Sequence, residues 1–166
     1  MATTASFDVT TSVDLQEVDN AVNQAQKEVA QRYDFKGAPV EIDFKRGESM
    51  IVLAADSDFR MTALFDVLQT KLIKRHVPVK NLDIGETKPA GGDTVRKEIK
   101  LKMALDADTA KKVAAAIKEA KLKKVQAAIL GDQVRVSSPS KDDLQEAMAL
   151  LRTKDFGVEL KFGNYR

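Results

Sequence analysis

The sequence contains no cysteine, a single histidine and few aromatic residues, which make up 5% of its 166 positions. Without cysteine, the chain can form neither disulfides nor thiolate metal sites, and this usage is compatible with a reducing cytosol. No apolar run approaches the roughly 20 residues of a membrane span. The first residues lack the basic and apolar regions of a signal peptide. We therefore expect a cytoplasmic protein without a membrane partner.

Residue patterns for catalysis are also scarce. His76 has no cysteine or carboxylate at ligand spacing and lies at an expected helix end, so we expect no metal site. Gly91 and Gly92 follow no strong strand and open no helix, which argues against a phosphate-cradling glycine loop. Ser137 and Ser138 have no histidine or lysine visibly placed to activate them. The sequence offers no argument for an enzyme and implies no cofactor.

Charge is distributed unevenly along the chain. The net charge is +2, and 43% of residues are apolar and 31% charged, as in a soluble globular protein. Residues 1–90 carry 11 Lys and Arg against 14 Asp and Glu, whereas residues 91–166 carry 16 against 11. A basic second half points mildly towards partners that bear phosphate, and a solvated lysine surface explains the same numbers.

The first half alternates between strand and helix patterns. By their apolar periodicity, strands are expected over residues 6–13, 40–44, 50–54 and 82–86. Asp14 and Ser57 each precede apolar residues at three- and four-residue steps, which predicts two capped amphipathic helices. A loop is expected over residues 88–93, and it is the best candidate for a domain boundary.

The second half repeats this order. The hairpin turns expected at Gly47 and Gly131 are 84 residues apart, and the helix starts at Ser57 and Ser140 are 83 apart. This near-constant offset indicates a duplicated strand-helix-strand-strand-helix-strand unit, which is the split βαβ or ferredoxin-like plan. The sequence therefore predicts an α+β fold with two tandem ferredoxin-like (βαββαβ) domains, over residues 1–90 and 91–166.

Several segments together resemble the YajQ family of bacterial cytoplasmic proteins. They cover nearly the whole chain and are Ser6-Phe7-Asp8, Arg32-Tyr33-Asp34-Phe35-Lys36-Gly37, Ser57-Asp58-Phe59, Lys71-Leu72-Ile73-Lys74-Arg75, residues 121–145 and Phe162-Gly163-Asn164-Tyr165-Arg166. No one of them is a catalytic signature. The resemblance implies two ferredoxin-like domains that exchange their first strands. Residues near 6–12 would then pair in the second sheet, and those near 95–103 in the first.

The resemblance also implies a function. The family is described as nucleotide-binding, and its members have been associated with cyclic di-GMP sensing and with nucleic-acid binding; it is not a family of known enzymes. We therefore expect a cytoplasmic nucleotide-binding protein that takes cyclic di-GMP or a related nucleotide and regulates a protein partner. Two alternatives stay open: a non-specific RNA- or DNA-binding protein, and a protein-interaction adaptor that uses the uncovered sheet faces.

The segment over residues 32–37 is the first candidate site. A cyclic dinucleotide needs cations or backbone donors for its phosphates, flat groups to stack on guanine, and a carboxylate for the guanine N1 and N2 donors. The residues that could supply these groups are Arg32, Tyr33, Asp34 and Lys36. The same segment also fits a helix C-terminus, with Phe35 as a core anchor, Arg32 and Asp34 as a local ion pair, and Gly37 in a left-handed cap.

The second candidate site is a group of cations. From residue 94 to 124 there are 10 Lys and Arg against 4 Asp and Glu, enough to hold a phosphate backbone through counterion release. The candidates are Lys100, Lys102, Lys121, Lys123, Lys124 and, on the returning strand of the second hairpin, Arg135. Lysines also suit helix C-termini and guard strand edges. Sequence-specific RNA recognition is disfavoured, because the chain lacks the aromatic signature of RNA-binding sheets.

Overall fold

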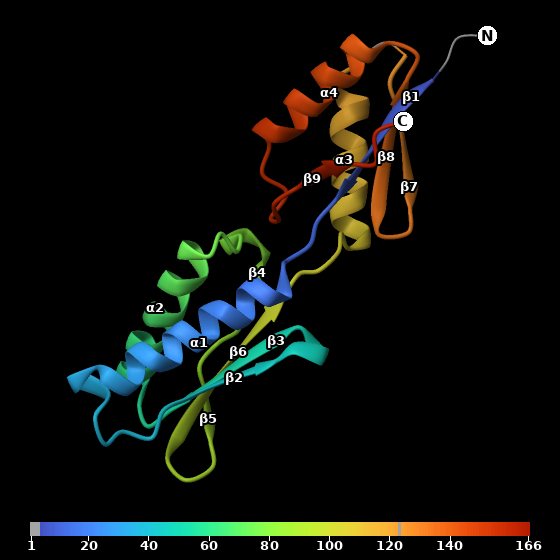
Figure 1. Ribbon diagram of the computed structural model, residues 1–166. Coiled ribbons are helices and arrows are strands. Elements are labelled where there is room, and N and C mark those ends of the chain that lie inside the picture. The colour runs from blue at the N-terminus through green and yellow to red at the C-terminus, as the bar shows by residue number, and fades with distance from the viewer. Residues whose placement is uncertain (1–3, 123) are drawn as a thin grey trace. The chain divides into compact units, whose positions relative to one another are not determined.

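A computed structural model describes residues 4–122 and 124–166 (Figure 1). These residues form two compact units. Val13–Lys102 is the central unit, and the residues up to Ser12 together with Met103–Arg166 are the terminal unit. The two ends of the chain therefore belong to the same unit.

The central unit places two helices on one face of an antiparallel sheet (Figure 1). Its helices are α1 (Leu15–Gln31) and α2 (Asp58–Lys74), with 3-10 turns η1 (Tyr33–Phe35), η2 (Arg46–Glu48) and η3 (Val79–Asn81). Its strands are β2 (Glu41–Lys45), β3 (Met50–Ala55), β4 (Leu82–Ile84), β5 (Lys88–Ala90) and β6 (Thr94–Leu101). The strand order is β2-β3-β6-β4, and β5 also pairs with β6.

Strand β5 corrects the loop expected over residues 88–93. Lys88–Ala90 pair antiparallel with β6, so that Pro89 lies opposite Val95. Only the following three residues form the turn, where Gly92 and Asp93 have φ of 70° and 57°. Proline and glycine in this segment suggested a loop, whereas pairing with the long strand β6 is a non-local contact that local composition does not reveal.

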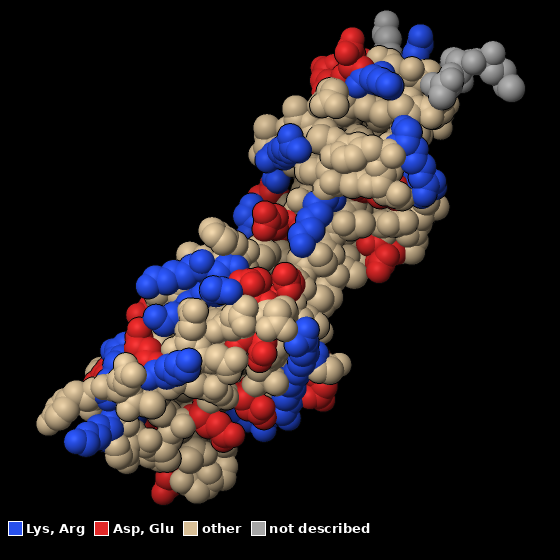
Figure 2. All heavy atoms as spheres, viewed as in Figure 1, with Lys and Arg blue, Asp and Glu red and all other residues tan. Residues whose placement is uncertain are grey.

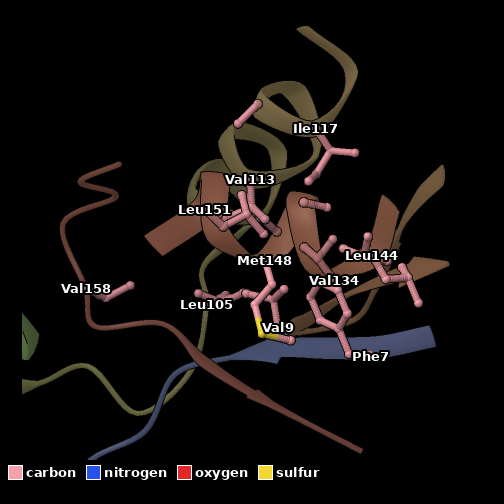
Figure 3. Close-up of a cluster of buried hydrophobic side chains, with 14 of the residues drawn as sticks. Phe7, Val9, Leu105, Val113, Ile117, Val134, Leu144, Met148, Leu151 and Val158 are labelled. Carbon is pink, nitrogen blue, oxygen red and sulfur yellow. The ribbon is translucent and has the colours of Figure 1, made fainter. Parts of the chain in front are cut away.

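The terminal unit has the same two-layer construction. Its helices are α3 (Ala107–Glu119) and α4 (Lys141–Thr153), and its strands are β1 (Ala5–Thr10), β7 (Gln126–Leu130), β8 (Gln133–Ser138) and β9 (Lys161–Gly163). The strand order is β7-β8-β1-β9. Figure 3 shows apolar side chains from the sheet meeting those of α3 and α4, among them Phe7, Val134, Val113 and Met148. This cluster is the core of the unit.

The two sheets are completed by strands from distant parts of the chain. β6 lies between β3 and β4, and β1 lies between β8 and β9. Each unit thereby combines two helices with a four-strand path, which confirms the α+β class with two tandem ferredoxin-like units. We propose that these units are the two domains and that they have exchanged their first strands. The chain then crosses between domains after Ser12 and again after Lys102.

Side-chain caps begin the four long helices at the positions that their sequences favour. The capping side chains belong to Asp14, Ser57, Asp106 and Ser140, and each accepts a hydrogen bond from a backbone N–H in the first turn. These bonds satisfy donors that the helix itself leaves unpaired. In the hairpin between β7 and β8, Gly131 has a φ of 64°, which glycine adopts without steric cost.

Candidate functional site

The first candidate segment forms a tight turn where α1 ends. α1 stops at Gln31, and η1 follows at once over Tyr33–Phe35. Phe35 is buried and anchors the turn in the core, while Gly37 has a φ of 75° that releases the chain towards β2. Between them the ring of Tyr33 is 89% exposed. The helix-end interpretation is therefore right for Phe35 and Gly37, and the turn also presents an aromatic ring to solvent.

Arg32 and Asp34 are joined to each other. Arg32 donates from Nε to Oδ1 of Asp34 at 2.9 Å and from Nη2 to Oδ2 at 2.7 Å. This two-pronged bond holds the pKa of the Asp34 carboxyl below its ordinary value. Glu28 accepts from Arg32 at 3.5 Å and from Lys71 at 3.0 Å, and chiefly the Lys71 contact lowers the pKa of Glu28. Arg32 is thus held at the end of a charge network that links α1 to α2.

A pocket of about 560 Å³ opens beside this turn. Its walls come from α1, η1, the segment after η1, β2 and Leu64 of α2, and its charged lining residues are Lys36 and Glu41. The described residues provide no ion-pair partner for Lys36, so its ammonium group is available to an anion entering the pocket. Pockets of 300 to about 1,000 Å³ are the usual size for small-molecule sites. The structure therefore places Lys36 at a ligand-sized cavity.

The start of α2 adds two residues that sequence reasoning missed. Arg60 donates from Nη1 to the backbone carbonyl of Asp34 at 2.6 Å and pairs with Asp56 at 2.9 Å. The ring of Phe59, the residue before Arg60, is 84% exposed. A signal was present in the sequence, because Phe59 falls outside the apolar stripe that begins at Met61. The turn η1 and the first turn of α2 thus each expose an aromatic ring beside an arginine.

The second candidate group is divided between the two units. Lys100 and Lys102 belong to the central unit, whereas Lys121 and Lys124 belong to the terminal unit. Lys121 and Lys124 are exposed, with φ of 53° and 66°. Lys123 lies outside the described residues. Cations that are close in the sequence therefore sit on separate bodies, and a shared phosphate surface stays a prediction.

Acidic residues accompany the cations on the helix-free face of the central sheet. Arg96, Glu98 and Lys100 alternate along β6 and so share that face. Arg96 pairs with Glu98 at 3.2 Å, and Lys100 lies opposite Asp83 on β4. A pocket of about 330 Å³ here is lined by Asp83, Glu86 and Glu98 as well as by Lys88, Arg96 and Lys100. Figure 2 likewise shows both signs of charge interspersed over the visible surface.

Arg135 has a different role from the lysines. It donates from Nε to Oδ1 of Asp8 at 2.9 Å, across the pairing of β8 with β1. Asp8 is only 3% exposed, although it lies on the polar side of an alternating strand, opposite to Phe7 and Val9. Asn164 also donates to Asp8, at 2.6 Å. Arg135 is therefore occupied in a structural ion pair, which argues against a phosphate contact from its guanidinium.

Two further features of the described residues bear on the kind of site. Within residues 4–122 and 124–166, no three His, Cys, Asp or Glu side chains converge in a way that could hold a metal ion. Among the same residues, no helix is long and apolar enough to cross a membrane.

The fold and the pocket beside η1 define a class: a small tandem ferredoxin-like protein with a ligand-sized cavity at a helix end. The sequence model of the family described as "Nucleotide-binding protein YajQ-like" matches residues 5–166. The chain belongs to this family.

Curated relatives match over all or nearly all of their length. A protein of Carboxydothermus hydrogenoformans named "Nucleotide-binding protein" is 50% identical, with all of both chains aligned. A protein of the same name from Desulfitobacterium hafniense is 47% identical, again over all of both chains. A third, from Trichlorobacter lovleyi, is 47% identical over 97% of this chain and 98% of its own. These names describe binding of a nucleotide.

Proposed function

We propose that the protein is a cytoplasmic nucleotide-binding protein whose ligand is a guanine nucleotide, with cyclic di-GMP as the leading candidate, and that it regulates a protein partner. The family and its relatives' names support the nucleotide. The observation that supports the site is the exposure of Tyr33 on η1, in the same short turn as Lys36, which lines the pocket.

The groups at this turn match the parts of such a ligand. Lys36 supplies a point charge for a phosphate, and Tyr33 offers a flat face for a base. Asp34 can accept from guanine N1 and N2 once the nucleotide draws Arg32 towards a phosphate. In this exchange one charge-assisted pair replaces another, so that the energetic cost of opening the Arg32–Asp34 pair is offset.

Titration calorimetry tests the proposal. Cyclic di-GMP, GMP, GTP and ATP are titrated separately into the intact protein, and heat is expected with a guanine nucleotide. Lys36→Ala and Tyr33→Ala should each weaken that binding by about tenfold. Tyr165→Ala is the matched control, because its ring is 62% exposed but belongs to the terminal unit. Absence of heat with all four ligands at high micromolar protein contradicts the proposal, and unchanged binding in both site variants contradicts the site.

A second candidate function is non-specific RNA or DNA binding by the terminal unit. It is supported by Lys118, Lys121 and Lys124, which are exposed on α3 and just after it. Binding to a mixed-sequence oligonucleotide should then weaken linearly with salt on logarithmic axes, and Lys121→Ala with Lys124→Ala should reduce the slope by about two. A gel shift that is absent or independent of salt counts against this function.

A further inference from the structure

Strand β7 is the outer strand of the terminal sheet. Within the described residues its one strand neighbour is β8, and the register pairs Ala127 with Val136 and Ile129 with Val134. The opposite edge of β7 therefore offers a row of backbone donors and acceptors. Such an edge can be extended by another strand, and proteins that remain monomeric usually blunt it.

The duplication provides an internal comparison. β2 holds the same place in the central sheet as β7 holds in the terminal sheet, at the outer end of the strand order. The helix-free face of β2 carries Glu41, Asp43 and Lys45, which guard that edge with charge. The corresponding positions of β7 are Gln126, Ala128 and Leu130. The central edge is thus charged, and the terminal edge carries no charge, no proline and no bulge.

The unguarded edge has apolar features on both sides of the strand. On the face towards α3, Ile129 is 44% exposed, and on the other face Leu130 is 40% exposed. A groove of about 450 Å³ runs between α3 and the start of β7. Its walls include the small side chains of Ala114, Ala115 and Ala127. A fifth strand beside β7 could place a branched side chain over this groove.

We propose that a second copy of this chain supplies that strand, by antiparallel pairing of β7 with β7 about a twofold axis at Ala128. In this register the exposed Ile129 lies opposite the partner's Ala127, where small residues leave the groove open. Continued beyond the two strand ends, the same register sets Lys124 against the partner's Asp132, on each side of the axis. Lys124 precedes β7 and Asp132 follows it. Two antiparallel copies of β7 therefore bring opposite charges together at both ends.

The pairing joins two terminal sheets into one. Each β7 gains backbone hydrogen bonds along its unpaired side, and two isoleucines are covered. The contact is small and local, so the dimer should be reversible and dependent on concentration. β7 and the residues that line the pocket beside η1 belong to different units, so a variant in one leaves the residues of the other unchanged.

Cysteine cross-linking tests the register. The chain has no cysteine, so a single introduced thiol reports on one position. Directly opposite Cα atoms in an antiparallel pair are about 4.5–5.5 Å apart, within the range of a disulfide. Ala128→Cys should therefore form a covalent dimer under mild oxidation. Asp43→Cys, at the corresponding position of β2, should remain monomeric. Equal cross-linking of the two variants, or none in either, overturns the proposal.

Sedimentation of the unmodified protein over a concentration series tests the pairing itself. The wild type should show a reversible monomer–dimer equilibrium, and Ala128→Lys, which sets two like charges opposite each other, should raise its dissociation constant about tenfold or more. Lys124→Asp and Asp132→Lys should each weaken self-association, whereas an equimolar mixture should form a heterodimer with every pair complementary. A protein that stays monomeric throughout, or a mixture without preference for the heterodimer, contradicts the twofold arrangement.

Discussion

Arg135 holds Asp8 across two neighbouring strands, with 2.9 Å between Nε and Oδ1. The pair lies on the helix-free face of the terminal sheet. The side-chain amide of Asn164 also donates a hydrogen bond to Oδ2 of Asp8, at 2.6 Å. A bulge makes this possible: Ser6 pairs with Arg166 and Asp8 with Gly163, so Asn164 and Tyr165 stand opposite Phe7 alone. The N-terminal strand and the C-terminal residues are thereby joined around one buried carboxylate.

Removing the partner of that carboxylate should destabilise the terminal unit. Arg135→Ala leaves Asp8 buried without its main donor, and an unpaired buried charge is costly. We expect the midpoint of thermal unfolding to fall by roughly 5 °C or more, measured by circular dichroism. Arg96→Ala is the control, because the Arg96–Glu98 pair is about half exposed, at 45% and 44%. A comparable loss in both variants contradicts a special role for the Asp8 pair.

The Asp8 carboxylate should also make the stability of the protein depend on pH. The pKa of Asp8 lies below its ordinary value of 3.8, chiefly because Arg135 donates a hydrogen bond to the carboxylate. Burial has the opposite effect and raises the pKa, but it does not outweigh the hydrogen bond. A depressed pKa in the folded state gives stability that is present above the unfolded pKa and is lost as pH falls through the folded pKa. The free energy of unfolding of the wild type, measured with urea, should therefore fall as the pH decreases from about 5 to about 2. Asp8→Asn should lose part of this dependence, and an unchanged pH profile argues against the assignment.

Replacing Gly85 with alanine tests how closely the chain after β4 approaches the backbone of β6. A Cβ added to Gly85 would lie 2.8 Å from the backbone carbonyl oxygen of Glu98, the atom to which the Gly85 N–H donates. Gly85→Ala should lower the free energy of unfolding by about 1–3 kcal/mol, because backbone must move. Gly47→Ala serves as the control, since a Cβ there meets nothing within 4 Å. The two variants are compared by chemical denaturation, and equal stabilities refute the predicted clash.

The proposed domain exchange predicts which fragment folds. A fragment over residues 13–102 retains β6 between β3 and β4 and should unfold cooperatively. A fragment over residues 1–90 lacks β6, so the edges of β3 and β4 are left unpaired, and no cooperative transition is expected. Thermal unfolding followed by circular dichroism distinguishes the two. A stable 1–90 fragment is the outcome that rejects the exchange.

Phe59 should contribute to binding and not to stability. Its ring is 84% exposed, so Phe59→Ala removes few native contacts and should leave the unfolding midpoint unchanged. If the ring stacks on a base of the proposed nucleotide, the loss should weaken affinity by about tenfold or more. Ile73→Ala, on the same helix and 53% exposed, is the control for both measurements. Equal affinities of the two variants show that Phe59 takes no part in the nucleotide site.

Local patterns predicted the helices well. On α4 the apolar residues that recur at three- and four-residue steps are Leu144, Ala147, Met148 and Leu151, and all four side chains are buried. The caps Ser57 and Ser140 begin α2 and α4 as expected. These features depend on residues within one or two turns of each other, which is the range over which periodicity and capping act.

The candidate site was less accessible to sequence reasoning. Arg32, Tyr33, Asp34 and Lys36 are consecutive or nearly so, and their types suggested both ligand recognition and a local Arg32–Asp34 pair, without deciding between the two. The structure separates the exposed Tyr33 and the pocket-lining Lys36 from the paired Arg32 and Asp34. It also adds Phe59 and Arg60 from a helix that begins more than twenty residues later. Contacts over that separation leave no periodic signal.

By itself the sequence determined the order of the elements apart from β5, the duplication and, through the resemblance, the family. The tertiary structure decided that the lysines of 94–124 divide between two units, that Asp8 is buried, and that Arg135 is occupied by it. It also decided that β7 lies at an unguarded edge. The physical reason is that charge and polarity are properties of one residue, whereas burial and pairing depend on which distant strand lies beside it. The cations of the second candidate group could therefore be counted from the sequence, but their positions in the fold could not be predicted.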